Sequence, residues 1–139
     1  MELYLIRHAQ SANQVLDQPD ARVFDPSLTD LGERQATLLA QHLGAGRERI
    51  RSARDGITSL ACSPMWRALQ TARPLGEALD LVPEVWLDLH EQVRAEEIRA
   101  GSSRGRIENA FPDYVLPEEI TERGWWNRGE ESHSETMER

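Results

Sequence analysis

The stretch LYLIRHAQS, residues 3–11, begins with an unbroken apolar segment and then reaches an arginine and a histidine side by side. Residues 3–6 carry no charge, and such a run is typical of a strand that is buried on both faces of a parallel sheet. We therefore expect a central strand at this position. Its carboxyl end would present Arg7 and His8 at the edge of the sheet where ligands bind in α/β proteins.

The rest of the chain alternates between helical and strand patterns. In order, we expect a helix within residues 28–46, a strand within residues 57–63, a helix within residues 64–80 and a strand within residues 82–91. Ser63 and Pro64 suit the cap and the first position of the second helix, and Pro74 is expected to kink or split it. This order predicts a single α/β domain over residues 1–139, with a mostly parallel central sheet between layers of helices.

The composition narrows the class of protein. The formal net charge of −8 argues against a nucleic-acid partner and against attraction to an anionic membrane. Cys62 is the single cysteine, so no internal disulfide can form. We read no signal peptide and no apolar run long enough for a membrane span, and a cytoplasmic location is the expectation. All 16 basic residues counted as lysine or arginine are arginine, so any anion site must use arginine, histidine or backbone amides.

Charged side chains follow each of the three predicted strands. Arg7 and His8 follow the first, Arg67 lies one turn beyond the second, and Glu91 ends the third. Because parallel strands end at one edge of a sheet, these groups are expected to gather there. Arginine suits phosphate oxygens, histidine can accept a phosphoryl group, and a carboxylic acid can protonate a leaving oxygen. No histidine pair has the spacing of metal ligands, and the set therefore favours metal-free phosphoryl transfer.

Four segments together resemble the histidine phosphatase superfamily, which includes the cofactor-dependent phosphoglycerate mutases. They are LIRHAQS at residues 5–11, LTDLGERQA at residues 28–36, CSPMWRALQTA at residues 62–72 and LDLHE at residues 87–91. They stand in the order that the family uses. The resemblance implies a phosphoglycerate mutase-like fold. Beyond residue 92 the sequence resembles the family only loosely.

The resemblance assigns roles to individual residues. It implies that His8 is the nucleophile and becomes a phosphohistidine, and that Glu91 protonates the leaving group and then helps to activate water. It implies no cofactor. The expected phosphate-binding residues are Arg7, Ser11, Asn13, Gln14 and Arg67.

The sequence departs from the family at its end. The family has a second catalytic histidine on a later strand, in the middle of the sheet, and this chain ends before any such strand. We therefore expect a C-terminally shortened member of the family. His133 is the only histidine near the end, and its polar surroundings argue against it as a replacement.

The leading function is hydrolysis of a small phosphorylated substrate. Two alternatives stay open: a mutase-type phosphotransferase, and a truncated domain that binds phosphate or a partner without catalysis. An RNA-binding function for the arginine-rich residues 47–54 is disfavoured by the net charge and by the lack of interleaved aromatic residues. A sheet left open at its centre could recruit a second copy of the chain, which makes a homo-oligomer a further expectation.

Overall fold

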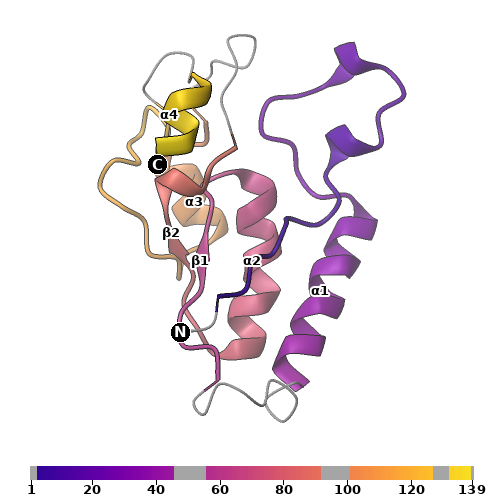
Figure 1. The fold of residues 1–139 in the computed structure, drawn as a ribbon, viewed down its shortest axis with the longest axis vertical. Coiled ribbons are helices and arrows are strands. Elements are labelled where there is room, and N and C mark those ends of the chain that lie inside the picture. Colours follow the sequence, from indigo (N-terminus) through magenta and orange to yellow (C-terminus); the bar gives the residue numbers. More distant parts are fainter. Residues whose placement is uncertain (1–2, 46–55, 92–100, 127–131, 139) are drawn as a thin grey trace.

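A computed structural model of the chain describes residues 3–45, 56–91, 101–126 and 132–138 (Figure 1). The helices are α1 (Asp30–Ala45), α2 (Trp66–Leu79), α3 (Arg104–Ala110) and α4 (His133–Glu138). The strands are β1 (Ala61–Cys62) and β2 (Glu84–Val85), and short 3-10 turns are η1 (Ala12–Gln14), η2 (Pro19–Ala21) and η4 (Leu87–Leu89). None of the described helices combines the length and the apolar character that a membrane crossing requires.

The strands β1 and β2 are parallel and are joined by α2, so this part of the chain is a βαβ unit. Cys62 pairs with Val85, and a single parallel bridge continues from Glu84 to Val115. The helices α1 and α2 lie together on one side of the two strands (Figure 1). The predicted α/β class is therefore confirmed, although the sheet of the described residues holds only two short strands.

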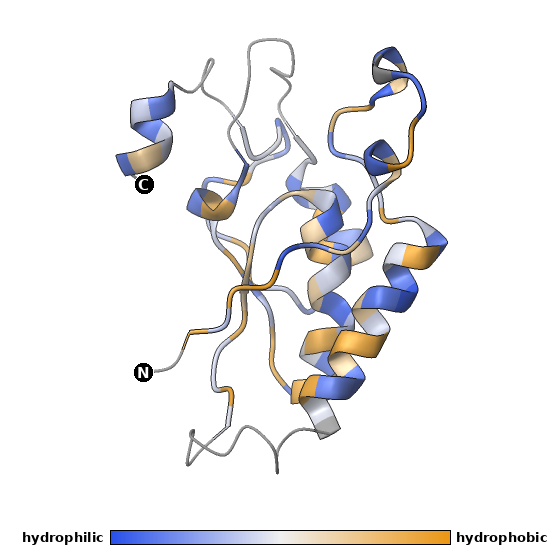
Figure 2. Ribbon diagram, turned by 45° about the vertical axis from the view of Figure 1, so that its right-hand side comes forward, coloured by the Kyte–Doolittle hydropathy of each residue, from blue (hydrophilic) through white to orange (hydrophobic). Residues whose placement is uncertain are grey.

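The core forms where α2, the strands and the segment around α3 meet. The side chains of Leu69, Ile107 and Ile120 are fully buried there. Both α1 and α2 carry apolar and polar residues, as Figure 2 shows. Helix α2 buries Leu69, Ala72 and Leu75. Helix α1 buries Ala36 and Ala40 but leaves Leu31 and Leu38 exposed. This packing anchors α2, the helix that carries Arg67.

The predicted strand at residues 3–6 is wrong for this structure. These residues form no strand, and Leu3 and Leu5 are 74% and 88% exposed. An apolar run becomes a buried strand only where neighbouring strands complete its hydrogen-bond ladder. In the described part of the chain the sheet consists of β1 and β2, which pair with each other.

The helix α2 also differs from its prediction. It begins at Trp66 rather than at Pro64, and the hydroxyl of Ser63 accepts a hydrogen bond from the Met65 N–H just before the helix. Pro74 does not split the helix, which continues to Leu79. A proline removes only one hydrogen bond of the ladder. The extensive packing of α2 against α1 outweighs that loss.

Gly32 lies in the first turn of α1 against the backbone of Gln10. A Cβ atom at Gly32 would stand 2.1 Å from the Gln10 carbonyl oxygen. We expect Gly32→Ala to lower the free energy of unfolding by about 1–2 kcal/mol, because overpacking outweighs the better helix propensity of alanine. Urea denaturation followed by circular dichroism measures this change.

The matched control for that substitution is Gly105→Ala in α3. A Cβ atom there would meet only the flexible end of Glu122, at 3.2 Å from its Oε2. This variant should unfold at the same urea concentration as the parent or a higher one. If Gly32→Ala also matched the parent, the close approach of α1 to Gln10 would not constrain the fold.

Candidate active site

The segment that follows His8 is held against both long helices. The Ala9 N–H donates to the Thr71 hydroxyl of α2 at 3.2 Å, and the Gln10 N–H donates to the side-chain carbonyl of Gln35 on α1 at 3.0 Å. The Gln10 carbonyl in turn accepts from the Thr29 N–H at 3.0 Å. The motif residues Gln35 and Thr71 therefore act as anchors that fix the backbone beside His8.

The imidazole of His8 is half-buried and has a defined orientation. Its Nδ1 lies 2.8 Å from the carbonyl oxygen of Ala9. A carbonyl oxygen only accepts hydrogen bonds, so Nδ1 must carry the proton. In the neutral ring this leaves the lone pair on Nε2, which is the arrangement that a nitrogen nucleophile needs.

The charges around His8 come from three predicted site residues. Burial lowers the pKa of His8, and the positive charges of Arg67 and Arg7 lower it further. The Ala9 carbonyl and the Glu91 carboxylate oppose that shift only in part. His8, Arg7, Arg67 and Glu91 thus share one electrostatic environment, and its net effect favours the neutral imidazole.

This lowered pKa has a direct consequence for reactivity. A neutral Nε2 persists at lower pH when the pKa falls below its ordinary value of 6.5. We expect the His8 ring to titrate below pH 6.5, and Arg7→Ala to move the midpoint upward because it removes a nearby positive charge. Histidine Cε1–H NMR titration, assigned with His8→Ala, measures both midpoints. A midpoint at or above 6.5 in the parent would contradict this electrostatic account.

Arg67 occupies the centre of the site. It is the second residue of α2, and its side chain is buried. Its Nη2 donates to the Glu91 Oε2 at 2.6 Å and contacts the Met65 sulfur at 3.2 Å. Its Nη1 lies 3.9 Å from the Asp25 Oδ1. The guanidinium therefore stands between a buried carboxylate and the exposed one of Glu91, whose side chain is 71% exposed.

The other predicted phosphate-binding residues lie in and around η1. Ser11 is buried, and its N–H donates to the side-chain carbonyl of Gln14 at 2.8 Å. That bond leaves the amide NH₂ as the part of Gln14 that could donate to an anion. Asn13 is placed differently, because both ends of its amide pair with the backbone of Val23, at 2.7 and 3.0 Å. A phosphate contact from Asn13 would have to break that pairing, whereas Arg7 is exposed and adjoins His8 directly.

Two further histidines, His90 and His133, have surroundings that differ from those of His8. His90 is buried, its Nδ1 lies 2.6 Å from the Leu87 carbonyl, and its ring packs on those of Trp125 and Trp126. These contacts give His90 a structural role. His133 begins α4 and is exposed, and it is not among the groups that shift the pKa of His8.

Two residues of the site have no counterpart in the sequence prediction. Asp25 accepts a hydrogen bond from the N-terminus of α2 and forms an ion pair with Arg67, although it precedes Trp66 by 41 residues. Met65 places its sulfur against both Arg67 and the N–H of Glu91, the latter at 3.5 Å. Asp25 lies outside all four motifs, and because its contact with α2 spans 41 residues, no signal in the sequence points to it.

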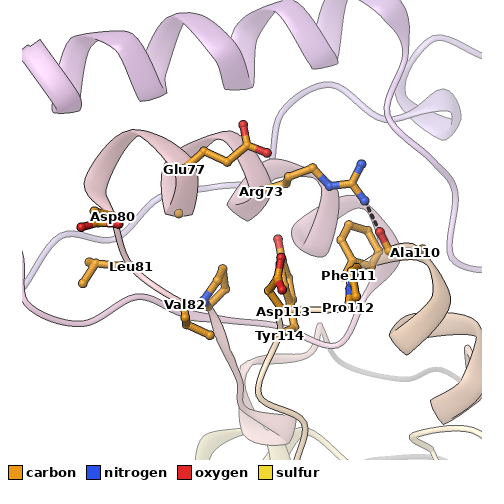
Figure 3. A pocket seen from close by; sticks show the side chains of 12 residues that line it. Arg73, Glu77, Asp80, Leu81, Val82, Ala110, Phe111, Pro112, Asp113 and Tyr114 are labelled. Atoms are coloured by element: carbon orange, nitrogen blue, oxygen red, sulfur yellow. Dashed lines mark hydrogen bonds between the residues drawn. The ribbon is translucent and has the colours of Figure 1, made fainter.

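A pocket of about 300 Å³ lies at the other end of α2 (Figure 3). Three carboxylates line it, those of Glu77, Asp80 and Asp113. Arg73 also lines it, and its guanidinium donates to the Ala110 carbonyl. Because three acids surround one arginine that is already bonded, this pocket would repel a phosphate. The described residues also contain no group of three histidine, cysteine or acidic side chains that could hold a metal ion.

Two solved structures of mycobacterial proteins are similar to part of this chain. A mycobacterial glucosyl-3-phosphoglycerate phosphatase in complex with VO3 matches at 27% identity and a TM-score of 0.50, over 76% of this chain and 44% of that one. A structure named mycobacterial hydrolase 1 matches at 27% identity and a TM-score of 0.49, over 76% of this chain and 45% of that one. This chain thus spans less than half the length of either protein, and the search of curated proteins found no match.

The family itself follows from a match along almost the whole chain. The sequence profile of the histidine phosphatase superfamily (branch 1) matches residues 3–139. This range contains His8, Arg67 and Glu91, and it extends past residue 92, where the resemblance of the motifs is loose. The chain belongs to the histidine phosphatase superfamily, branch 1.

Proposed function

We propose that the protein is a phosphomonoester phosphatase that works through a phosphohistidine on His8 and needs no metal ion. The observation that carries this proposal is the state of His8. Its Nδ1 is hydrogen-bonded to the Ala9 carbonyl, and burial, together with the charges of Arg67 and Arg7, lowers its pKa. A neutral imidazole whose lone pair is on Nε2, under the influence of the positive charges of Arg67 and Arg7, suits attack on a bound phosphate.

In the first step, Arg7 and Arg67 hold the phosphoryl oxygens and offset their charge. The Nε2 lone pair of His8 attacks phosphorus, the N–P bond forms and the P–O bond to the leaving group breaks. Glu91, which takes up a proton from solvent once the phosphate has displaced it from Arg67, gives that proton to the leaving oxygen. Because the guanidinium of Arg67 bonds Glu91 in the structure, an arriving phosphate exchanges places with that carboxylate at Nη2.

In the second step, a water molecule attacks the phosphohistidine and the N–P bond breaks. The Glu91 carboxylate takes a proton from this water, and inorganic phosphate leaves. These two steps regenerate the neutral His8 and the acid form of Glu91. We favour hydrolysis over mutase-type transfer because a solved structure similar to this chain is that of a phosphatase. A small phosphorylated compound in the cytoplasm is the proposed substrate.

A second candidate function is phosphate binding without turnover. It is favoured by one observation: among the described residues, Arg67, Arg7 and Glu91 are the charged side chains that shift the pKa of His8, and no second histidine does. Such a protein would bind phosphate or vanadate but release no product.

Hydrolysis of p-nitrophenyl phosphate by the 139-residue chain in EDTA separates the two functions. We expect turnover that EDTA does not reduce. Vanadate binding measured on the same sample shows whether the phosphate site is formed. Binding without turnover would support the second candidate, and a folded chain that shows neither would refute both.

A further inference from the structure

We propose that Asp25 is a positioning residue for catalysis. It fixes the position and the electrostatic environment of the phosphate-binding Arg67. The inference rests on the proposed function and extends it to a residue outside the predicted site. Asp25 lies in the loop between η2 and α1, and its side chain is 6% exposed. Its carboxylate joins this loop to two other parts of the chain, the start of α2 and the segment before α3.

The first contact of Asp25 fixes the start of α2. Met65 provides no side-chain cap for this helix. The Asp25 Oδ1 instead accepts a hydrogen bond from the Trp66 N–H at 2.6 Å. A carboxylate at a helix N-terminus satisfies a free N–H and complements the positive end of the helix dipole. Because Arg67 follows Trp66 directly, this bond fixes the backbone from which the arginine extends.

The second contact concerns the guanidinium itself. The Nη1 of Arg67 lies 3.9 Å from the buried Asp25 Oδ1, whereas Nη2 reaches the exposed Glu91. An incoming phosphate can displace the exposed carboxylate, but the buried one is not exchangeable in this way. Asp25 therefore compensates the charge of Arg67 before and after substrate binds, while the Glu91 side changes.

Two further features support an organising role for Asp25. Its Oδ2 accepts a hydrogen bond from the buried hydroxyl of Ser102 at 3.4 Å, which ties the segment before α3 to the same carboxylate. Its backbone φ is +51°, a left-handed conformation that residues other than glycine rarely adopt. Strained backbone that surrounding contacts hold in place is typical of functional sites.

The test uses titration with orthovanadate, a phosphate analogue, by isothermal calorimetry on the full chain. Asp25→Asn keeps an oxygen for the Trp66 N–H and removes the negative charge. We expect it to weaken vanadate binding about tenfold, a size typical of coupling between contacting residues, because Arg67 loses the carboxylate that orients its guanidinium and this loss outweighs the gain from removing a negative charge near the anion. In an Arg67→Gln background the same substitution should change binding by less than about twofold, because the residue on which Asp25 acts is gone.

Asp80→Asn is the matched control. Asp80 also has a left-handed backbone, with φ +57°, but it is exposed and ends α2 at the opposite end from Arg67. This variant should bind vanadate like the parent. Circular dichroism of each variant reports whether it is folded, and Asp25→Asn is chosen over alanine because it can retain the helix cap.

Three outcomes would overturn the inference, and they can be told apart. A parent that binds no vanadate refutes the proposed function together with the role of Asp25. A parent that binds, with Asp25→Asn binding equally well, refutes the role of Asp25 alone. An equal loss with and without Arg67 would show that Asp25 acts on general stability and not through the arginine.

Discussion

Replacing His8 with alanine is expected to lower turnover of an aryl phosphate on the order of 10⁴-fold or more, as removal of an enzyme nucleophile does. The variant should also fail to form a phosphoenzyme. In the parent, quenching without acid soon after addition of substrate with a labelled phosphate should trap labelled phosphate bound to the protein. This bound phosphate should be stable in alkali and lost in acid, as expected for a phosphohistidine. The orientation of the ring is the physical reason, since the Ala9 carbonyl holds the proton on Nδ1 and leaves Nε2 to attack.

His133→Ala is the matched control for this experiment. His133 is exposed on α4 and does not influence the pKa of His8. We expect this variant to keep the activity of the parent. If it lost activity as His8→Ala does, His133 would replace the second histidine of the family. If His8→Ala kept its turnover, the phosphohistidine mechanism would be refuted.

The grouping of the four charged residues was more predictable than the sheet. Arg7, His8, Arg67 and Glu91 belong to motifs whose spacing is set by local structure, and the structure groups their charges around one imidazole. The strand at residues 3–6 could not be predicted in the same way. Its apolar pattern reports a tendency to be buried, but burial also depends on neighbouring strands that the pattern does not contain.

Asn13 and Asp25 show the same limit at the level of single side chains. The neighbours of Asn13 in the sequence do not reveal that its amide pairs with Val23, ten residues later. Asp25 carries no local sign of its position beside α2, because that contact spans 41 residues. The helix α1, in contrast, follows from local periodicity and capping, and its predicted range agrees closely with the observed Asp30–Ala45.

Replacing Arg67 with glutamine is expected to lower kcat/KM for an aryl phosphate by about 10³- to 10⁵-fold, the range found for arginines that stabilise phosphoryl transfer. The buried guanidinium contacts both Glu91 and Asp25. Arg67→Lys keeps a positive charge but loses the planar fork, so we expect activity between those of the parent and Arg67→Gln. Steady-state kinetics of the three proteins measures the order, with the exposed Arg34→Gln of α1 as the control that should match the parent.

A loss of activity in Arg67→Gln has to be separated from a loss of fold. Removing one partner of a buried charge pair destabilises a protein by up to about 3–5 kcal/mol, because the other charge stays buried without compensation. Asp25 would be that charge, so the double variant Asp25→Asn, Arg67→Gln should unfold at a higher urea concentration than Arg67→Gln alone. Since both charges are then absent, its activity should stay as low as that of the single variant. If activity returned together with stability, Arg67 would act through the fold and would not bind the phosphoryl group.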